Sequence, residues 1–213
     1  MKPWLVAAAL CALIVAPMTT PAEEGQDIEV DGRHFAPTIA IEHDDTVHEL
    51  HATGSHKRKK FFFSIYAAVA YVGGSDFWAV VERGAERSDW GELLLGAEGP
   101  HRMHLKMLRG LDATRITNGI NEAIEKTATR PLEEIAEERE RFVGLFDGEL
   151  DEDQSLLMTW FHGEGLEIRI DEEVIDTIPG DDFARTFFEI YFGPEPIDDG
   201  MKEDLLRRVR GDD

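Results

Sequence analysis

The stretch that decides the fold is HKRKKFFFSIYAAVAYVGG, residues 56–74. Four consecutive cations precede three phenylalanines and a run of small apolar side chains. Because successive side chains of a β-strand point to opposite faces, residues 57–72 are predicted to form one long strand with two apolar faces. Such a strand is typical of the interior of a sheet that is covered on both sides. One face is bulky, whereas the other steps down to small residues and leaves room beside Tyr66 for a helix or a ligand.

Alternation of apolar and polar residues predicts strands on both sides of this stretch. Asp31-Gly32 and Asp44-Asp45 are typical turn residues between the short strands that come before it. After it, one strand and then a meander of three strands are expected. The expected strand segments are 27–32, 38–43, 46–53, 101–108, 156–163, 166–173 and 174–178.

Helical periodicity covers most of the remaining chain. Ser75 is a candidate N-cap, and Gly193 is a natural C-terminal stop. A break is expected at Arg130-Pro131, because the residue before a proline disfavours the helical conformation. The expected helical segments are 76–86, 89–98, 112–146 in two parts, 181–193 and 201–210. Together the patterns predict one α+β domain, in which helices gather mainly on one side of a sheet.

Residues 1–22, MKPWLVAAALCALIVAPMTTPA, have the pattern of a secretory signal peptide: an early lysine, an apolar stretch and a small residue before an acidic segment. The apolar stretch is shorter than the roughly 20 residues that a membrane-spanning helix needs. We therefore expect one exported domain over 23–213, periplasmic or secreted, without a stable membrane span. Cys11 is the only cysteine and lies in the segment to be removed, so neither a disulfide nor a cysteine ligand is expected.

The net charge of the chain limits the classes of partner that it can bind. Without residues 1–22 the chain has 21 cations against 44 acids, a formal charge of −23. Such a surface repels phosphate backbones, so a nucleic-acid partner is not expected. The chain also lacks a glycine-rich phosphate loop and a G-x-S-x-G nucleophile elbow. Most of its carboxylates are interpreted as solvated surface charges.

Histidines are concentrated in two places. Five of the eight lie between residues 34 and 56, and two more form HRMH at 101–104. Metal binding is one interpretation. However, both H-x-x-H pairs fall on expected strands, where a spacing of three turns the side chains to opposite faces. We therefore interpret the histidines as exposed polar positions on edge strands, and we expect no metal site.

The cation run 57–60 has two interpretations. Lysines at the end of an apolar strand stay solvated and protect the sheet against edge pairing and aggregation. Alternatively, one member points inward at a bound carboxylate or enolate beside an apolar cleft. Arg58 is best suited to that role, because its planar guanidinium binds carboxylates with two parallel hydrogen bonds.

Three segments resemble the chalcone isomerase-like family, and specifically its secreted bacterial branch. They are RKKFFFSIYAAVAYV (58–72), HRMHLKMLRGLDATRITNGINEAI (101–124) and IPGDDFARTFFEIYFGPEPIDDGMKEDLL (178–206). The resemblance is collinear over nearly the whole chain after residue 22. It implies an open-faced β-sandwich, in which a large antiparallel sheet carries helices on one face with a hydrophobic cleft between them.

The resemblance also implies site residues. Plant chalcone isomerases use an arginine, a threonine, a tyrosine, an asparagine and a further polar residue, whereas fatty-acid-binding relatives hold a carboxylate with an arginine and a tyrosine. In this chain Arg58 matches the arginine, and Tyr66 stands at the strand threonine. Thr114 stands at the tyrosine before the central helix, Asn121 matches the asparagine, and Ile190 stands at the further polar residue.

These matches favour binding over catalysis. Loss of one well-placed donor commonly lowers an enzymatic rate by about 10² to 10³, and the set is altered at several places. The first hypothesis is a noncatalytic periplasmic protein without a cofactor that binds a fatty acid or similar amphipathic anion. Its predicted ligand-binding residues are Arg58, Tyr66, Asn121 and Thr114, and the floor of its cleft is the strand face of Ser64, Ala68 and Ala70.

Two alternatives remain open. One is an isomerase or intramolecular lyase that acts on a chalcone-like conjugated substrate through stabilisation of an enolate. The other is an interaction or structural protein whose cleft is closed by aromatic side chains.

Overall fold

The computed structural model describes residues 26–60, 62–84, 89–146 and 148–211. The predicted signal segment 1–22 lies outside these ranges. A seven-stranded antiparallel sheet forms the centre of the fold, in the order β11-β10-β9-β6-β5-β4-β3. Its strands are β3 (Thr38–His43), β4 (Thr46–Lys60), β5 (Phe63–Val72), β6 (His101–Met107), β9 (Ser155–Phe161), β10 (Gly165–Ile170) and β11 (Glu173–Pro179).

Two smaller sheets flank the large one. β1 (Ile28–Val30) pairs with β2 (Arg33–Phe35), and β7 (Leu111–Asp112) pairs with β8 (Glu149–Leu150). The helices are α1 (Ser75–Glu82), α2 (Trp90–Leu95), α3 (Ala113–Thr127), the 3-10 helix η1 (Leu132–Ile135), α4 (Ala136–Gly144), α5 (Asp181–Phe192), α6 (Asp199–Leu205) and α7 (Arg207–Arg210). None of these helices is long and apolar enough to cross a lipid bilayer.

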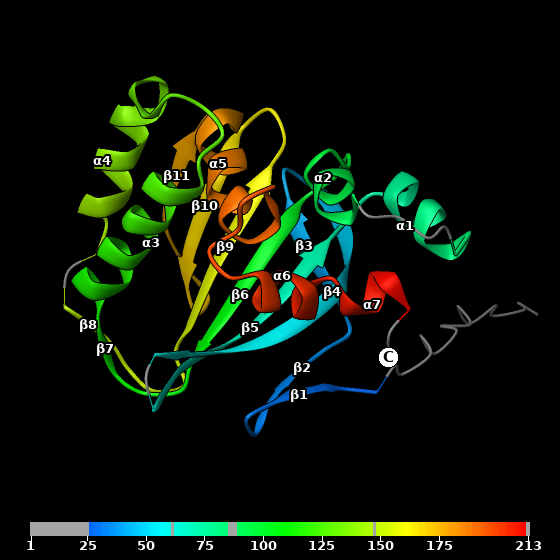
Figure 1. Ribbon diagram of the computed structural model, residues 1–213, viewed down its shortest axis with the longest axis horizontal. Helices are drawn as coiled ribbons and strands as arrows, with labels where there is room; N and C mark the ends of the chain where they lie inside the picture. Colours follow the sequence, from blue (N-terminus) through cyan, green and yellow to red (C-terminus); the bar gives the residue numbers. More distant parts are fainter. Residues whose placement is uncertain (1–25, 61, 85–88, 147, 212–213) are drawn as a thin grey trace, which may run out of the picture.

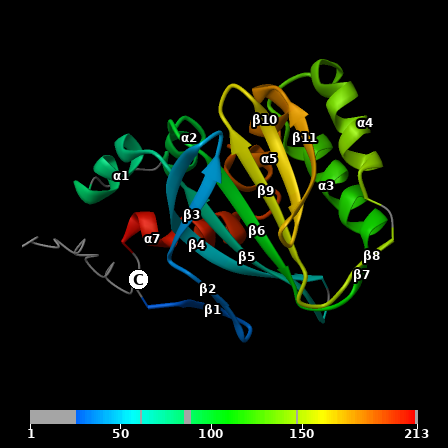
Figure 2. The same cartoon turned by 180° about the vertical axis from the view of Figure 1, so that it is seen from behind.

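The helices cover one face of the large sheet. Figure 1 shows α3, α4, α5 and α6 in front of the strands, and Figure 2 shows the opposite face with the β1–β2 hairpin beside it. This is the open-faced arrangement that the sequence predicted. The predicted α+β class is therefore confirmed.

The two faces of β5 belong to two different cores. Ala68, Ala70 and Val72 pack with the helices, whereas Val69 and Tyr71 pack against the β1–β2 side of the sheet. β5 also lies inside the sheet, between β4 and β6. The predicted interior strand with two apolar faces is thus confirmed over this part of the chain.

The prediction of one strand over 57–72 is wrong. The chain turns between Lys60, at the end of β4, and Phe63, at the start of β5, and these two residues are paired in the ladder. Phe62 lies in the turn with 99% of its surface exposed. The hairpin is favoured because the 15 residues of β4 and the 10 of β5 satisfy each other's backbone hydrogen bonds. The cation run therefore belongs to β4, beside β5 instead of before it.

A β-bulge changes which face the first residues of β5 present. Arg58 pairs with Tyr66 and Lys59 pairs with Ser64, so Ile65 is the extra residue. An extra residue interrupts the strict alternation of side chains. As a result Ile65 and Tyr66 both reach the helix side of the sheet, whereas Ser64 contacts Asp31 in the β1–β2 turn on the other side.

Other boundaries differ from the predictions in small ways. Strand β2 was not expected. Gly74 is the N-cap of α1 with φ 90°, and Ser75 is the first helical residue, without a side-chain capping bond. The predicted terminal helix is two short helices, α6 and α7, which meet at Leu206. The predicted break at Arg130-Pro131 is confirmed, because α3 ends at Thr127 and η1 begins at Leu132.

Candidate functional site

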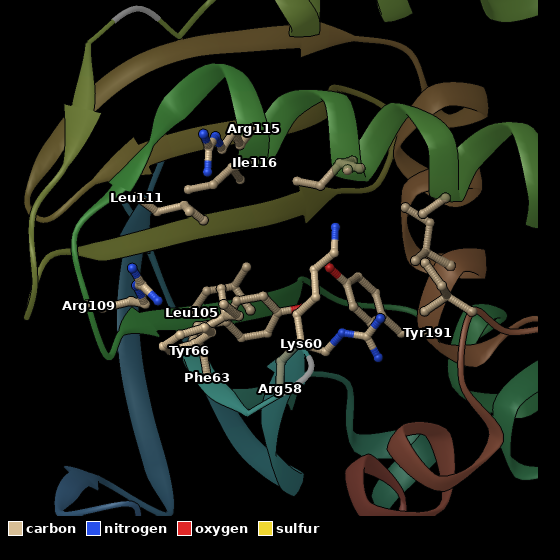
Figure 3. A pocket seen from close by; sticks show the side chains of 16 residues that line it. Arg58, Lys60, Phe63, Tyr66, Leu105, Arg109, Leu111, Arg115, Ile116 and Tyr191 are labelled. Atoms are coloured by element: carbon tan, nitrogen blue, oxygen red, sulfur yellow. The ribbon is translucent and has the colours of Figure 1, made fainter.

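A cavity of about 500 Å³ lies between the helix layer and the sheet. Strands β4, β5 and β6, the loop before β7, and helices α3 and α5 contribute to it (Figure 3). Most of its lining is apolar. The lining residues are Arg58, Lys60, Phe63, Ile65, Tyr66, Leu105, Arg109, Leu111, Arg115, Ile116, Gly119, Ile120, Ala123, Ile190, Tyr191 and Ile197.

Strand alternation divides the cation run between the two faces of the sheet. Arg58 and Lys60 line the cavity, whereas Lys57 reaches the other face, where its Nζ lies 2.8 Å from Asp31 Oδ1. The run therefore supplies cavity-lining cations from one face of β4 and a surface ion pair from the other. Arg58 lies where the ligand-binding interpretation puts it.

Arg58 is held in place by helix α6. Its Nη1 donates to Asp198 Oδ2 at 3.1 Å, and the other oxygen of Asp198 caps α6 by accepting from the Met201 amide at 3.0 Å. This backbone hydrogen bond, with the nearby Arg58 charge, lowers the pKa of Asp198. The carboxylate is therefore ionised at neutral pH. Only one of the guanidinium N–H groups is used by Asp198, and an arginine has five.

The same face of β4 fastens α6 at two further points. The Thr53 hydroxyl donates to the Leu205 carbonyl at 2.8 Å, and His56 Nδ1 lies 2.9 Å from Asp204 Oδ2. Gly54 permits this approach, because an added Cβ would lie 2.6 Å from the Leu205 carbonyl oxygen. The position of Asp198, and so of Arg58, depends on this docking.

Two phenols accompany Arg58. Tyr66 stands directly opposite Arg58 in the β4–β5 ladder, and its hydroxyl is hydrogen-bonded to that of Tyr191 on α5. Burial raises the pKa of Tyr66, although the Arg58 charge opposes the change. Burial, and then the neighbouring Tyr66, raise the pKa of Tyr191 well above its ordinary value. Both phenols therefore stay protonated and can donate hydrogen bonds at neutral pH.

The cavity is polar at its two ends. Figure 3 shows Arg58 near Tyr191 at one end and Arg109 with Arg115 at the other, with the apolar residues Leu111 and Ile116 toward the second end. The Arg109 guanidinium carbon lies 4.9 Å from the centre of the Phe63 ring, a cation–π geometry. Among the described residues that line the cavity, four are cations and none is acidic.

Two of the four predicted ligand-binding residues line the cavity, and two do not. Arg58 and Tyr66 are brought together as adjacent lining residues. Asn121 instead accepts hydrogen bonds from Arg139 of α4, at 3.1 and 2.8 Å. Thr114 is exposed and is not among the lining residues. Ile190 does line the cavity.

The predicted floor also differs. Ala68 and Ala70 are fully covered by the helix-side core and do not line the cavity, and Ser64 points to the other face because of the bulge at Ile65. Sequence reasoning missed Tyr191, Lys60, Arg109 and Arg115. Arg109 directly follows the predicted strand 101–108, which was the available signal for it, whereas Arg115 lies in the first turn of α3.

The histidines were interpreted as exposed positions on edge strands, and the structure contradicts this for most of them. His48, His51 and His56 are half-buried on β4, which lies inside the sheet. His101 is fully buried on β6, an interior strand, and His104 is partly buried. They do point to opposite faces, as predicted: His101 packs on Phe188 of α5 and His104 on Phe35 of β2.

Among the described residues, one group has the composition of a metal site. The ligand atoms of His43, Asp44 and Glu164 lie within 4.8 Å of one another. His43 Nε2 is already 2.8 Å from Glu164 Oε2, and the ring of His43 stacks on Phe161. These contacts account for the group as surface structure.

Comparison with known proteins identifies the family of this chain. Residues 27–207 match the chalcone isomerase-like family, so the chain belongs to this family. Among solved structures, a fatty-acid binding protein of Arabidopsis thaliana has the same fold, with a TM-score of 0.68 and 18% sequence identity. The likeness covers 87% of this chain and 98% of that protein. A search of the curated proteins found no match.

Proposed function

We propose that this protein is a noncatalytic carrier, exported to the periplasm, that binds a fatty acid or a similar amphipathic anion in the cavity. The observation that carries the proposal is the cross-strand pair of Arg58 and Tyr66 at one end of an apolar cavity. A cavity of about 500 Å³ lies within the roughly 300 to 1,000 Å³ that is usual for small-molecule sites.

The carboxylate of the ligand would lie beside Arg58. The guanidinium supplies charge-assisted hydrogen bonds from the N–H groups that Asp198 leaves unused, and the protonated phenols of Tyr66 and Tyr191 supply neutral donors. The acyl chain would lie along the apolar lining, where each buried methylene contributes about 0.8 kcal/mol. A fatty acid needs a few polar groups for its carboxylate and an apolar lining for its chain, and the cavity has both.

Two further facts support the proposal. The structurally similar Arabidopsis protein is a fatty-acid binding protein, although at 18% identity the likeness bears on the fold alone. Export rests on the signal-peptide pattern of residues 1–22.

Cyclisation of a chalcone-like substrate is less well supported. Of the residues that the family resemblance assigns to that reaction, Thr114 and Asn121 do not line the cavity, and Ile190 presents an apolar side chain there. An absorbance assay with a chalcone separates the two functions. Cyclisation above the uncatalysed rate that is lost in Arg58→Ala would overturn the carrier proposal.

The direct experiment measures selectivity for the head group. The protein is purified, stripped of copurified lipid, and titrated with palmitate and with 1-hexadecanol, which has the same chain without a charge. We expect palmitate to bind at least about tenfold more tightly, because hydrogen bonds to charged groups contribute more than neutral ones. Mass spectrometry of the stripped lipid should identify acyl carboxylates. Equal affinity for the two probes would contradict the proposal.

A further inference from the structure

The cavity has more positive charge than one carboxylate needs. In the part of the lining that the structure describes, Arg58, Lys60, Arg109 and Arg115 are cationic and no residue is acidic, in a chain with twice as many acids as cations. Asp198 supplies a counter-ion to Arg58 from outside the lining, and like charges that gather without a counter-ion, as the other three do, repel one another. The excess therefore points to a ligand that supplies the missing negative charge.

The four lining cations differ in whether they form an ion pair with a carboxylate. Eight arginines in the described ranges form ion pairs with carboxylates, and Arg58 is one of them. Within the same ranges Lys60, Arg109 and Arg115 have no ion pair with a carboxylate. Arg109 is instead positioned by the Phe63 ring, which leaves its N–H groups available.

The unpaired arginines are also separated from Arg58. In Figure 3, Arg109 and Arg115 lie at one end of the cavity, Arg58 and Tyr191 lie at the other, and Lys60 lies between them. Apolar side chains of Leu105, Leu111 and Ile116 line the space. A single carboxylate at Arg58 would leave Arg109 and Arg115 without a partner.

We infer that the ligand has an anionic group at each end of its acyl chain. This inference rests on the proposed function and names the ligand class more closely. One carboxylate binds at Arg58 and the phenols, the chain lies on the apolar lining, and the second anionic group binds between Arg109 and Arg115. Both arginines are exposed, so the second group lies at the open end of the cavity.

Hexadecanoate and hexadecanedioate are suitable probes, because they share a chain and differ in the second carboxylate. Each is titrated calorimetrically into the lipid-free wild type and into the double variant Arg109→Gln/Arg115→Gln. Lys126→Gln is the matched control, since Lys126 is an exposed cation on α3 that does not line the cavity.

The wild type and the control should bind hexadecanedioate about tenfold more tightly than hexadecanoate, as a further charge-assisted pair implies. The double variant should lose this preference, so that its affinities for the two probes agree within about twofold. Its circular dichroism and urea midpoint, compared with those of Lys126→Gln, show whether the variant is folded.

Three outcomes overturn the inference. Wild-type protein that binds hexadecanoate, but hexadecanedioate no more tightly, contradicts it and leaves the proposed function intact. Equal weakening of both probes in the double variant means that a single head group lies at Arg109 and Arg115. Binding of neither probe to the wild type removes the proposed function, and the inference with it.

Discussion

Arg58 and Tyr66 face each other across the β4–β5 ladder, and both side chains reach the same cavity. Residues paired in a ladder share a face of the sheet, so the hairpin brings a cation and a phenol together from strands that adjoin at a turn. The bulge at Ile65 adds a second apolar side chain to this face. Local strand geometry places Arg58 beside Tyr66, and contacts with α5 and α6 complete the polar end of the cavity.

The phenols are expected to act as neutral donors over a wide pH range. Burial raises the pKa of Tyr66 and of Tyr191, so neither hydroxyl ionises between pH 7 and pH 9.5. Palmitate affinity should therefore be constant over this interval when measured by calorimetry. Tyr66→Phe should weaken binding about tenfold, because the carboxylate loses one hydrogen bond. A fall in affinity toward pH 9.5 that is absent in Tyr66→Phe would contradict the assignment.

Stability should fall in mild acid because of buried histidines. Burial lowers the pKa of His101 and of His104 to about 4, whereas an unfolded histidine has a pKa of about 6.5. Between about pH 6.5 and pH 4 the unfolded chain therefore binds more protons than the folded chain. The free energy of unfolding falls as the pH is lowered through this range. His101 alone should contribute about 2 kcal/mol of this loss at pH 5.

Urea denaturation at pH 7.5 and pH 5 measures this loss. His101→Gln should show a smaller difference between the two pH values than the wild type. His34→Gln, a change at an exposed position, should leave the difference unchanged. An undiminished difference in His101→Gln would show that other groups are responsible.

Gly54→Ala tests the docking of α6 on β4. The new Cβ would collide with the main-chain carbonyls of Asp204 and Leu205, and forced overpacking typically costs about 1 to 3 kcal/mol. The free energy of unfolding should fall accordingly, and palmitate should bind more weakly because Asp198 moves away from Arg58. Gly144→Ala is the control, since no atom lies within 4 Å of its added Cβ. Equal stability of the two variants would contradict this account of Gly54.

The apolar faces of β5 could be predicted because they follow from alternation alone, and the break before Pro131 follows from proline chemistry. The turn inside the phenylalanine run could not, since it contains no glycine, asparagine or proline. The bulge at Ile65 depends on the register with β4, which one strand's sequence does not contain. For that reason Ser64 does not lie in the predicted floor, whereas Ala68 and Ala70 are covered by the helix-side core.

The site was predicted in part. Arg58 and Tyr66 were matched through the family resemblance, and the pairing of β4 with β5, which was not predicted, brings them together at the cavity. Asn121 and Thr114 lie at the surface of α3, where each residue turns about 100° around the axis. Gly119 and Ile120 face the cavity, whereas Asn121 contacts α4. Tyr191 is one of many buried residues of α5, and its role emerges only from the position of Tyr66.

The most direct test of the central claim uses neighbouring residues of the cation run. Arg58→Gln and Lys57→Gln each remove one positive charge from the same strand, but only Arg58 lines the cavity, and Lys57 pairs with Asp31 on the other face. Palmitate dissociation constants are measured by calorimetry for both variants. Arg58→Gln should bind at least about tenfold more weakly than the wild type, and Lys57→Gln should bind like it. Equal affinities of the two variants would contradict a carboxylate site at Arg58.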